Sequence, residues 1–93
     1  MAKYRLIWTS RFTKKARRWL RIHPNLRQVF EQTLIALNED PFAPSLRLHA
    51  LSGRLSDCYA ISVTYSDRII LTLEISDKEI TLLDIGSHDE VYR

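Results

Sequence analysis

The stretch that decides the fold is CYAISVTYSDRIILTLEI, residues 58–75, because apolar and polar side chains alternate along two runs within it. The apolar face consists of Tyr59, Ile61, Val63 and Tyr65 in the first run and of Ile69, Leu71, Leu73 and Ile75 in the second. A period of two is typical of strands with one buried face. Ser66 and Asp67 lie between the runs and predict a two-residue turn, so the stretch is expected to form a β-hairpin.

Two further segments extend this hairpin into a sheet. After the polar turn SDKE, residues 76–79, the run ITLLDI, residues 80–85, predicts a third strand. Three strands joined by short turns form an antiparallel meander. KYRLIWT, residues 3–9, also alternates, and it predicts a strand that joins the meander at its edge or in its interior.

Two amphipathic helices are predicted between the first strand and the meander. Ser10 is the expected N-cap of the first helix, Pro24 ends it, and Asn25 with Gln28 resembles a capping box that opens the second. The apolar stripes are Phe12, Ala16, Trp19 and Leu20 in one helix and Leu26, Val29, Phe30, Leu34 and Leu37 in the other. The predicted class is α+β in the order β-α-α-β-β-β, a small, mostly antiparallel sheet with a two-helix hairpin on one face.

Length and composition restrict the class of protein. The 93 residues, of which 45% are hydrophobic and 27% charged, predict a single domain over residues 1–93. No apolar run is long enough to span a membrane, and the N-terminus lacks the pattern of a signal peptide. Cys58 is the single cysteine, so no internal disulfide forms. The expected location is the cytoplasm, without a membrane partner.

Charge is divided unequally along the chain. Residues 1–54 hold eleven Lys and Arg against three acids, a net charge of +8, whereas residues 55–93 hold three against eight, a net charge of −5. A basic half attracts a polyanion such as nucleic acid or an acidic protein partner. The alternative interpretation is a helix whose charged face is simply solvated.

Several kinds of chemistry lack a motif in this sequence. Gly53 and Gly86 are isolated, so no phosphate-binding glycine-rich loop is present. The histidines at 23, 49 and 88 are far apart, and no Cys or His pair has zinc spacing. We therefore expect neither a metal nor a cofactor.

Acid-base chemistry remains. Cleaving RNA without a metal requires a base for the 2′-hydroxyl, an acid for the leaving 5′-oxygen, and cations for the phosphate. His49 lies in the long connection 40–57 and His88 follows the last strand, and both positions favour side chains that face a cleft. For each histidine taken alone, a surface or structural role is the simpler interpretation; His23, next to Pro24, is interpreted as structural.

Three segments carry a resemblance to a known family: LHALSG (48–53), DCYAISVTYSDRIIL (57–71) and LLDIGSHDEVY (82–92). With the order of elements, they make the chain similar over essentially its whole length to the RelE/ParE superfamily of bacterial toxins, the toxin halves of type II toxin-antitoxin pairs. The resemblance implies a ribosome-dependent endoribonuclease that cuts messenger RNA in the ribosomal A site and is neutralised by a cognate antitoxin protein.

The resemblance also implies roles for individual residues. Arg68 matches a phosphate-contacting arginine, Tyr92 an aromatic that stacks on a base, and His88 a basic or acid-base position. His49 and Asp67 match functional positions of the YafQ-like branch. RNA or ribosome contacts are expected from the basic residues Lys14, Lys15, Arg17, Arg18, Arg21, Arg47, Arg54 and Arg93.

The chain departs from the family pattern at three positions. Ala60 and Ser62 stand where RelE-like relatives carry lysine or arginine, and Val63 stands where YafQ-like toxins carry histidine. Two alternatives to the nuclease therefore stay open. One is a ParE-like inhibitor of DNA gyrase that does not cut RNA, and the other is a catalytically weakened toxin that acts mainly as the partner of its antitoxin. An antitoxin with an acidic, amphipathic helix is expected in every case.

Overall fold

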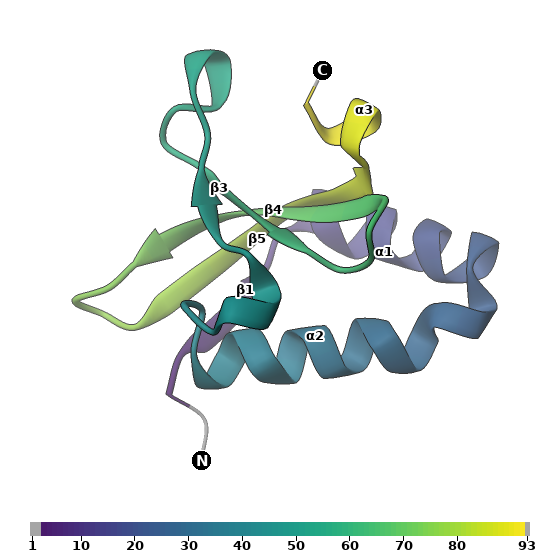
Figure 1. The fold of residues 1–93 in the computed structure, drawn as a ribbon, viewed down its shortest axis with the longest axis horizontal. Helices are drawn as coiled ribbons and strands as arrows, with labels where there is room; N and C mark the ends of the chain where they lie inside the picture. Colours follow the sequence, from purple (N-terminus) through teal and green to yellow (C-terminus); the bar gives the residue numbers. More distant parts are fainter. Residues whose placement is uncertain (1–2, 93) are drawn as a thin grey trace.

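The computed structural model describes residues 3–92, which form a five-stranded sheet with two long helices on one side and a short helix on the other (Figure 1). The strands are β1 (Arg5–Trp8), β2 (His49–Ala50), β3 (Tyr59–Ser62), β4 (Asp67–Glu74) and β5 (Glu79–Ser87). The helices are α1 (Ser10–Ile22), α2 (Arg27–Glu39) and α3 (His88–Val91), with 3₁₀ turns η1 (Pro24–Leu26), η2 (Pro44–Leu46) and η3 (Gly53–Leu55).

The sheet has the order β1-β5-β4-β3-β2. Only β1 runs parallel to its neighbour, with Leu6 opposite Ile80, and the remaining pairs are antiparallel. The parallel pair arises because α1 and α2 carry the chain from β1 back to the sheet. The predicted meander, the helical hairpin and the α+β class are confirmed, and β1 joins at the edge.

The main core lies between the sheet and the α1–α2 hairpin. Phe12 and Trp19 of α1 and Phe30 of α2 are buried there. The Phe30 ring contacts both of the other rings, and Trp8 packs edge to face on Phe12. The strands contribute the buried side chains of Ile61, Ile69, Leu71, Ile80, Leu82 and Ile85. The predicted apolar stripes of both helices therefore face this core.

A second, smaller apolar cluster covers part of the opposite face of the sheet. Ala60 of β3, Ile70 of β4 and Val91 of α3 form its buried centre. Gly86 makes this possible because a Cβ there would lie 3.0 Å from the Glu90 side chain and 3.4 Å from Val91. Figure 1 shows α3 on the side of the sheet opposite α2, so the C-terminal segment folds over the face that the long helices leave open.

Several local predictions were wrong. Thr9, not Ser10, caps α1, since the Thr9 hydroxyl accepts a hydrogen bond from the Phe12 amide at 3.1 Å. The second helix begins at Arg27 without a side-chain cap, because Pro24 starts a 3₁₀ turn over the residues predicted to form a capping box.

The predicted hairpin also differs in detail. β3 ends at Ser62, residues 63–66 form the bend, and Asp67 already belongs to β4. Tyr65 therefore leaves the apolar face on which alternation placed it and is 94% exposed. The pairing of β4 with β5 shifts register between Ile70 and Leu71. Both residues are buried because they lie on opposite faces of the sheet, Leu71 in the main core and Ile70 in the cluster under α3. Helix α3 and strand β2 were not predicted; His49, expected in a connection outside the strands, lies in β2 because its segment pairs with the edge of β3. Among the helices of residues 3–92, none is both long and apolar enough to cross a membrane.

Candidate active site

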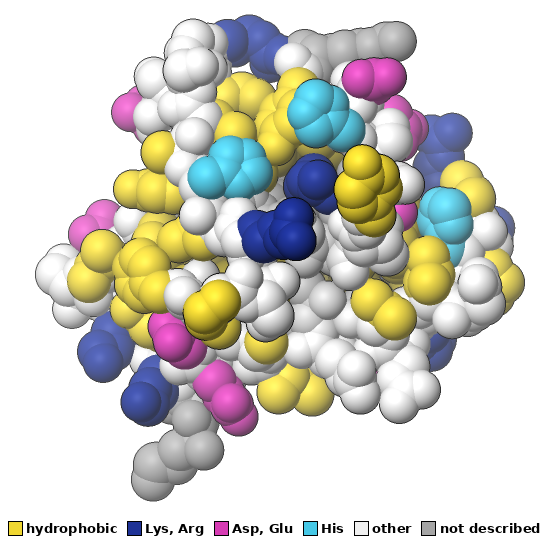
Figure 2. Space-filling model, viewed as in Figure 1, with side chains coloured by type: hydrophobic (Ala, Val, Ile, Leu, Met, Phe, Trp, Pro, Cys, Tyr) yellow, Lys and Arg dark blue, Asp and Glu magenta, His cyan; other side chains and the backbone are white. Residues whose placement is uncertain are grey.

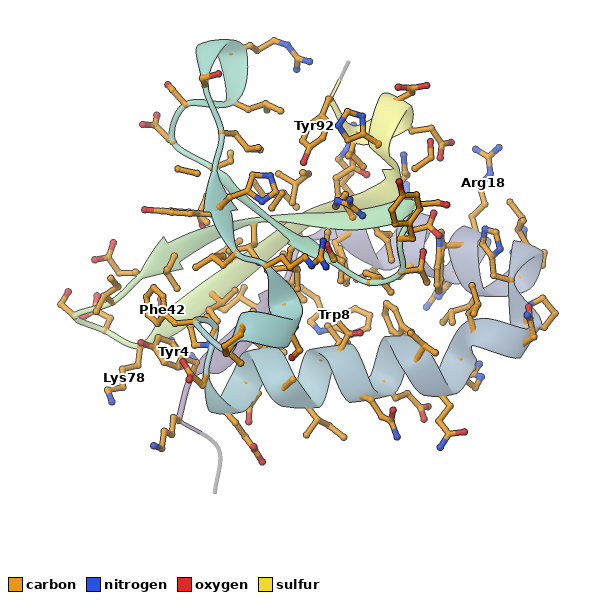
Figure 3. All side chains as sticks on the ribbon, in the orientation of Figure 1. Tyr4, Trp8, Arg18, Phe42, Lys78 and Tyr92 are labelled. Carbon is orange, nitrogen blue, oxygen red and sulfur yellow. The ribbon has the colours of Figure 1, made fainter. Side chains whose placement is uncertain are left out.

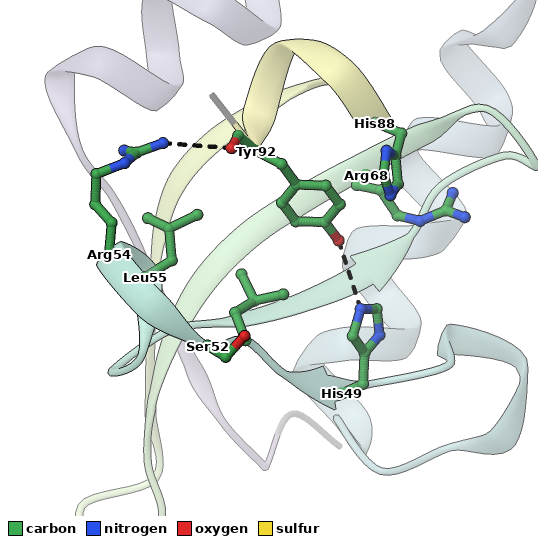
Figure 4. A pocket seen from close by; sticks show the side chains of 8 residues that line it. His49, Ser52, Arg54, Leu55, Arg68, His88 and Tyr92 are labelled. Carbon is green, nitrogen blue, oxygen red and sulfur yellow. Dashed lines mark hydrogen bonds between the residues drawn. The ribbon is translucent and has the colours of Figure 1, made fainter.

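A pocket of about 450 Å³ opens on the face of the sheet that carries α3 (Figure 4). It is lined by His49, Leu51, Ser52, Arg54, Leu55, Arg68, His88 and Tyr92. These residues come from the connection 49–55, from β4 and from the C-terminal segment. Figure 2 shows histidine and Lys or Arg side chains close together on this side of the molecule. Segments far apart in sequence thus bring two histidines, two arginines and a tyrosine to one cavity.

His49 and Tyr92 meet across the pocket. The Tyr92 hydroxyl lies 3.4 Å from Nε2 of His49, a long hydrogen bond (Figure 4). On the other side of the imidazole, Nδ1 lies 3.0 Å from the carbonyl oxygen of Arg47. A carbonyl only accepts, so we assign the proton of the neutral ring to Nδ1. The Nε2 lone pair of His49 then faces the pocket, which is the arrangement that a general base requires.

His88 packs against the other side of Tyr92. The two ring centroids are 4.4 Å apart with the planes at 80°, an edge-to-face contact. Nδ1 of His88 lies 3.6 Å from a carboxylate oxygen of Asp89, whose side chain is largely exposed. A protonated His88 would be paired with this carboxylate, and the outer face of the imidazole stays open to solvent.

Arg68 joins the pocket to the β3–β4 bend. Its Nη1 donates hydrogen bonds to the carbonyl oxygens of Thr64, Tyr65 and Asp67, at 2.9, 3.0 and 3.0 Å. Among residues 3–92, its Nε and Nη2 atoms donate no hydrogen bond. One edge of the guanidinium therefore fixes the bend while the rest of its charge is available to an anion in the pocket.

Asp67 lies outside the pocket. Its side chain is 7% exposed and accepts a hydrogen bond from the Thr64 hydroxyl at 2.8 Å. The Thr64 oxygen in turn accepts from the amide of Asp67 at 3.1 Å. This reciprocal pair closes the bend that Arg68 holds, so Asp67 contacts the backbone frame of the site rather than its cavity.

A capping box positions His88 and Tyr92. The Ser87 hydroxyl accepts from the Glu90 amide at 3.3 Å, and the Ser87 amide donates to Oε1 of Glu90 at 2.8 Å. The bonds from the Ser87 backbone and then its side chain lower the pKa of Glu90, and the charges of Lys15 and Arg18 act in the same direction. The sequence signal for this helix is SHDE, residues 87–90, which has the spacing of a capping box but was not among the predicted elements.

The basic residues predicted to bind RNA are spread over several surfaces. Arg54 lines the pocket, and its Nη2 donates to the carbonyl oxygen of Tyr92 at 3.3 Å. Lys15 pairs with Asp84 at 3.2 Å, and Lys15 and Arg18 line a separate cavity beside Glu90. Four of the predicted RNA-binding residues are exposed and line neither cavity: Lys14, Arg17, Arg21 and Arg47. Arg93 lies outside the described residues.

The three departures from the family pattern have different surroundings. Ala60 is fully buried beneath Val91 and Ile70, so this position offers no surface to a ligand. Ser62 is half-buried. Val63 is buried in the core on the helical side of the sheet and is remote from the pocket lining. The cations near the pocket are thus Arg54 and Arg68 instead of side chains from β3.

The pocket lining also includes three residues that the sequence did not indicate, Leu51, Ser52 and Leu55. Their apolar surface narrows the pocket, and Ser52 adds a hydroxyl. Within residues 3–92, no cluster of three or more His, Cys, Asp or Glu side chains has the arrangement of a metal site.

Several solved structures of toxins share the small α+β fold of this chain. A metal-bound toxin from Helicobacter pylori aligns with a TM-score of 0.76 and 21% identity over 98% of this chain and 99% of its own. The YoeB/ParE toxin from Agrobacterium tumefaciens aligns with a TM-score of 0.75 and 17% identity, over 90% of this chain and 98% of its own. A chain of the E. coli DinJ-YafQ toxin-antitoxin complex aligns with a TM-score of 0.71 and 18% identity, over 98% of this chain and 99% of its own.

These similarities confirm the predicted RelE/ParE-like fold. At these identities they establish the fold alone. No protein-family model and no curated protein sequence matches this chain.

Proposed function

We propose that the chain is the toxin of a type II toxin-antitoxin system and cleaves messenger RNA in the ribosomal A site. The observation that carries the proposal is the convergence of His49, Arg68, His88 and Tyr92 on one pocket of this fold. Ribosomes would be the site of action, so the protein would work in the cytoplasm.

The proposed chemistry is metal-independent acid-base cleavage. Nε2 of His49 accepts the proton of the 2′-hydroxyl, whose oxygen attacks the adjacent phosphorus. The bond from phosphorus to the 5′-oxygen breaks, and protonated His88 gives that oxygen a proton. The products are a 2′,3′-cyclic phosphate and a free 5′-hydroxyl. The free edge of Arg68 stabilises the charge that develops on the phosphate, and Tyr92 stacks on a base.

Asp67 has a supporting role in this scheme. Its buried hydrogen bonds with Thr64 close the bend whose carbonyl groups orient Arg68. A second group of residues, the exposed cations of α1, would contact ribosomal RNA and add salt dependence to binding. The partner in the resting state would be an antitoxin, which agrees with the antitoxin present in the DinJ-YafQ complex of similar fold.

The test is primer extension on a defined messenger RNA in a purified translation system, with wild type and His88→Ala compared. We expect a cut in the A-site codon that the variant loses by about 10²- to 10⁴-fold in rate. Undiminished cleavage by the variant would remove His88 from the mechanism.

A weakened toxin that acts chiefly as the partner of its antitoxin is the second candidate. The burial of Ala60 favours it, because an apolar cluster occupies a position where the family resemblance implies a lysine or arginine. Absence of cleavage at every protein concentration, together with normal growth of cells that express the free chain, would select this candidate. Arrest of DNA supercoiling without RNA cleavage would instead select a gyrase inhibitor.

A further inference from the structure

Tyr65 is the most exposed large hydrophobic residue of the described chain, with 94% of its surface accessible. It lies at the bend between β3 and β4, directly beside the candidate active site. The strand pattern predicted it on the buried face, so its position outside the core is a product of the bend geometry.

The bend that presents Tyr65 is held firmly. Arg68 donates to the Tyr65 carbonyl at 3.0 Å, and the Ser66 amide donates to the Thr64 hydroxyl at 3.2 Å. The His88 amide donates to the Ser66 carbonyl at 3.1 Å, which ties the bend to the first residue of α3. A fixed backbone that carries a bare aromatic ring reduces the entropy lost when the ring binds a partner.

A second hollow of about 410 Å³ lies between this bend and α3, lined by Tyr65, Ser66, Arg68, Ser87, His88 and Asp89. Two of these residues, Arg68 and His88, also line the first pocket. The two hollows therefore flank the same pair of polar groups. Each has one tyrosine in its lining, Tyr92 in the first and Tyr65 in the second.

The chemistry of the second hollow favours a nucleoside over a phosphate. Asp89 carries a carboxylate that is 91% exposed, and this charge repels an anion at that end of the hollow. The same oxygens accept hydrogen bonds from the exocyclic amino group of a base. The hydroxyls of Ser66 and Ser87 add acceptors and donors for a base edge or a ribose.

We propose that Tyr65 forms the stacking wall of a second nucleoside site, which holds the residue of single-stranded RNA next to the one on Tyr92. The phosphate between the two nucleosides would lie at Arg68 and His88. The inference rests on the proposed function only in taking single-stranded RNA as the occupant of the first pocket. Stacking of bases on tyrosine is the usual way in which proteins hold unpaired RNA.

The test measures binding of a 2′-O-methyl RNA trinucleotide, which cannot be cleaved, to the full chain at low salt. The proteins compared are wild type, Tyr65→Ala, Tyr65→Phe and Phe42→Ala. Phe42 is a matched control because it is also an exposed aromatic, at 53%, and it lies beside Tyr4 and Lys78, far from Tyr92 (Figure 3). Thermal unfolding of each protein shows that the fold is retained.

We expect Tyr65→Ala to weaken binding about 5- to 100-fold, the range for loss of one stacked base, while Tyr65→Phe and Phe42→Ala bind as wild type. Equal affinity of Tyr65→Ala and wild type, or no binding by wild type up to millimolar RNA, would overturn the inference. A loss in Tyr65→Phe as large as in Tyr65→Ala would show that the hydroxyl acts instead of the ring, which also overturns it. Loss of antitoxin binding by Tyr65→Ala with RNA affinity unchanged would assign the ring to a protein contact.

The binding experiment tests the second nucleoside site separately from the proposed nuclease activity. If wild type cleaves ribosome-bound RNA but trinucleotide affinity does not depend on Tyr65, the second site is refuted and the nuclease stands. If trinucleotide affinity depends on Tyr65 but no cleavage occurs on ribosomes, the nuclease is refuted and the nucleoside site stands.

Discussion

The hydroxyl of Tyr92 lies 3.4 Å from Nε2 of His49, so that a residue of the C-terminal segment meets one 43 positions earlier. This contact closes the pocket between the connection 49–55 and α3. The two side chains also act on the same proton site, because the Arg47 carbonyl binds Nδ1 of His49 and leaves Nε2 directed at Tyr92.

Removing the Tyr92 hydroxyl should separate two functions of this residue. Tyr92→Phe keeps the ring for stacking and for its edge contact with His88, so cleavage should fall by less than about tenfold. His49→Ala should lower the rate by about 10²- to 10⁴-fold, since it removes the base. Single-turnover cleavage on programmed ribosomes measures both. A Tyr92→Phe defect as large as that of His49→Ala would mean that the hydroxyl takes part in proton transfer.

Arg68→Lys should be damaging although the charge is kept. The guanidinium holds three carbonyl oxygens through Nη1 alone and keeps Nε and Nη2 for an anion, whereas lysine has one nitrogen and cannot do both. We expect a loss of about 1–3 kcal/mol in the free energy of unfolding and a slower cleavage rate. Urea unfolding and single-turnover assays measure the two effects. Arg27→Lys is the matched control because Arg27 makes only an exposed pair with Glu31 at 3.7 Å, and it should behave as wild type.

Substitutions of Asp67 and Thr64 should show whether Asp67 supports the β3–β4 bend or transfers a proton in the reaction. Asp67→Asn keeps an oxygen that accepts from the Thr64 hydroxyl, so stability and cleavage should both stay near wild type. Thr64→Val leaves the buried carboxylate without that donor and should cost about 1–3 kcal/mol in the free energy of unfolding. Calorimetry and cleavage assays are run on both variants. Abolished cleavage by a fully stable Asp67→Asn protein would contradict the supporting role and indicate acid-base participation.

The cap of α3 should weaken in acid. Hydrogen bonds from Ser87 lower the pKa of Glu90 below its ordinary value of 4.5. Because the folded-state pKa is depressed, the ionised carboxylate stabilises α3 fully above the unfolded value and this contribution is lost as the pH falls through the folded value. Glu90→Gln lacks the titrating charge, so its Tm should fall below that of wild type at neutral pH and approach it in acid. A Tm difference that does not change with pH would contradict the linkage.

Exposed cations of α1 should control the salt dependence of ribosome binding. Replacing Lys14, Arg17 and Arg21 with Gln should reduce the slope of log affinity against log salt by about 2, if each contacts one phosphate of RNA. The matched triple replaces Lys3, Arg5 and Lys78, which line a groove at the other end of the sheet, and should leave the slope unchanged. Binding is measured by sedimentation with ribosomes over a range of salt. Equal slopes for the two triples would mean that α1 has no special part in ribosome binding.

The fold was predictable where the pattern of side chains reflects burial. Phe12, Ala16 and Trp19 recur at helical spacing because one face of α1 is buried, and Ile69 and Leu71 mark the buried side of β4. Prediction failed at the bend, where Tyr65 continues the apolar alternation but lies beyond the end of β3 at Ser62 and is exposed. It failed at α3 because a helix of four residues has no apolar periodicity, so its local signal is the capping box of Ser87 and Glu90.

Sequence alone was enough for the α+β class, the order of the elements, the resemblance to RelE/ParE toxins and the candidates His49, Arg68, His88 and Tyr92. The class, the order of the elements and the two histidines follow from local periodicity and residue type, whereas Arg68 and Tyr92 follow from the resemblance. Only the tertiary structure decided that the four side chains share one pocket, that Asp67 lies outside it, and that Tyr65 projects beside a second hollow. The reason is that strand pairing and the packing of α3 on the sheet depend on contacts between distant residues, which no local pattern encodes.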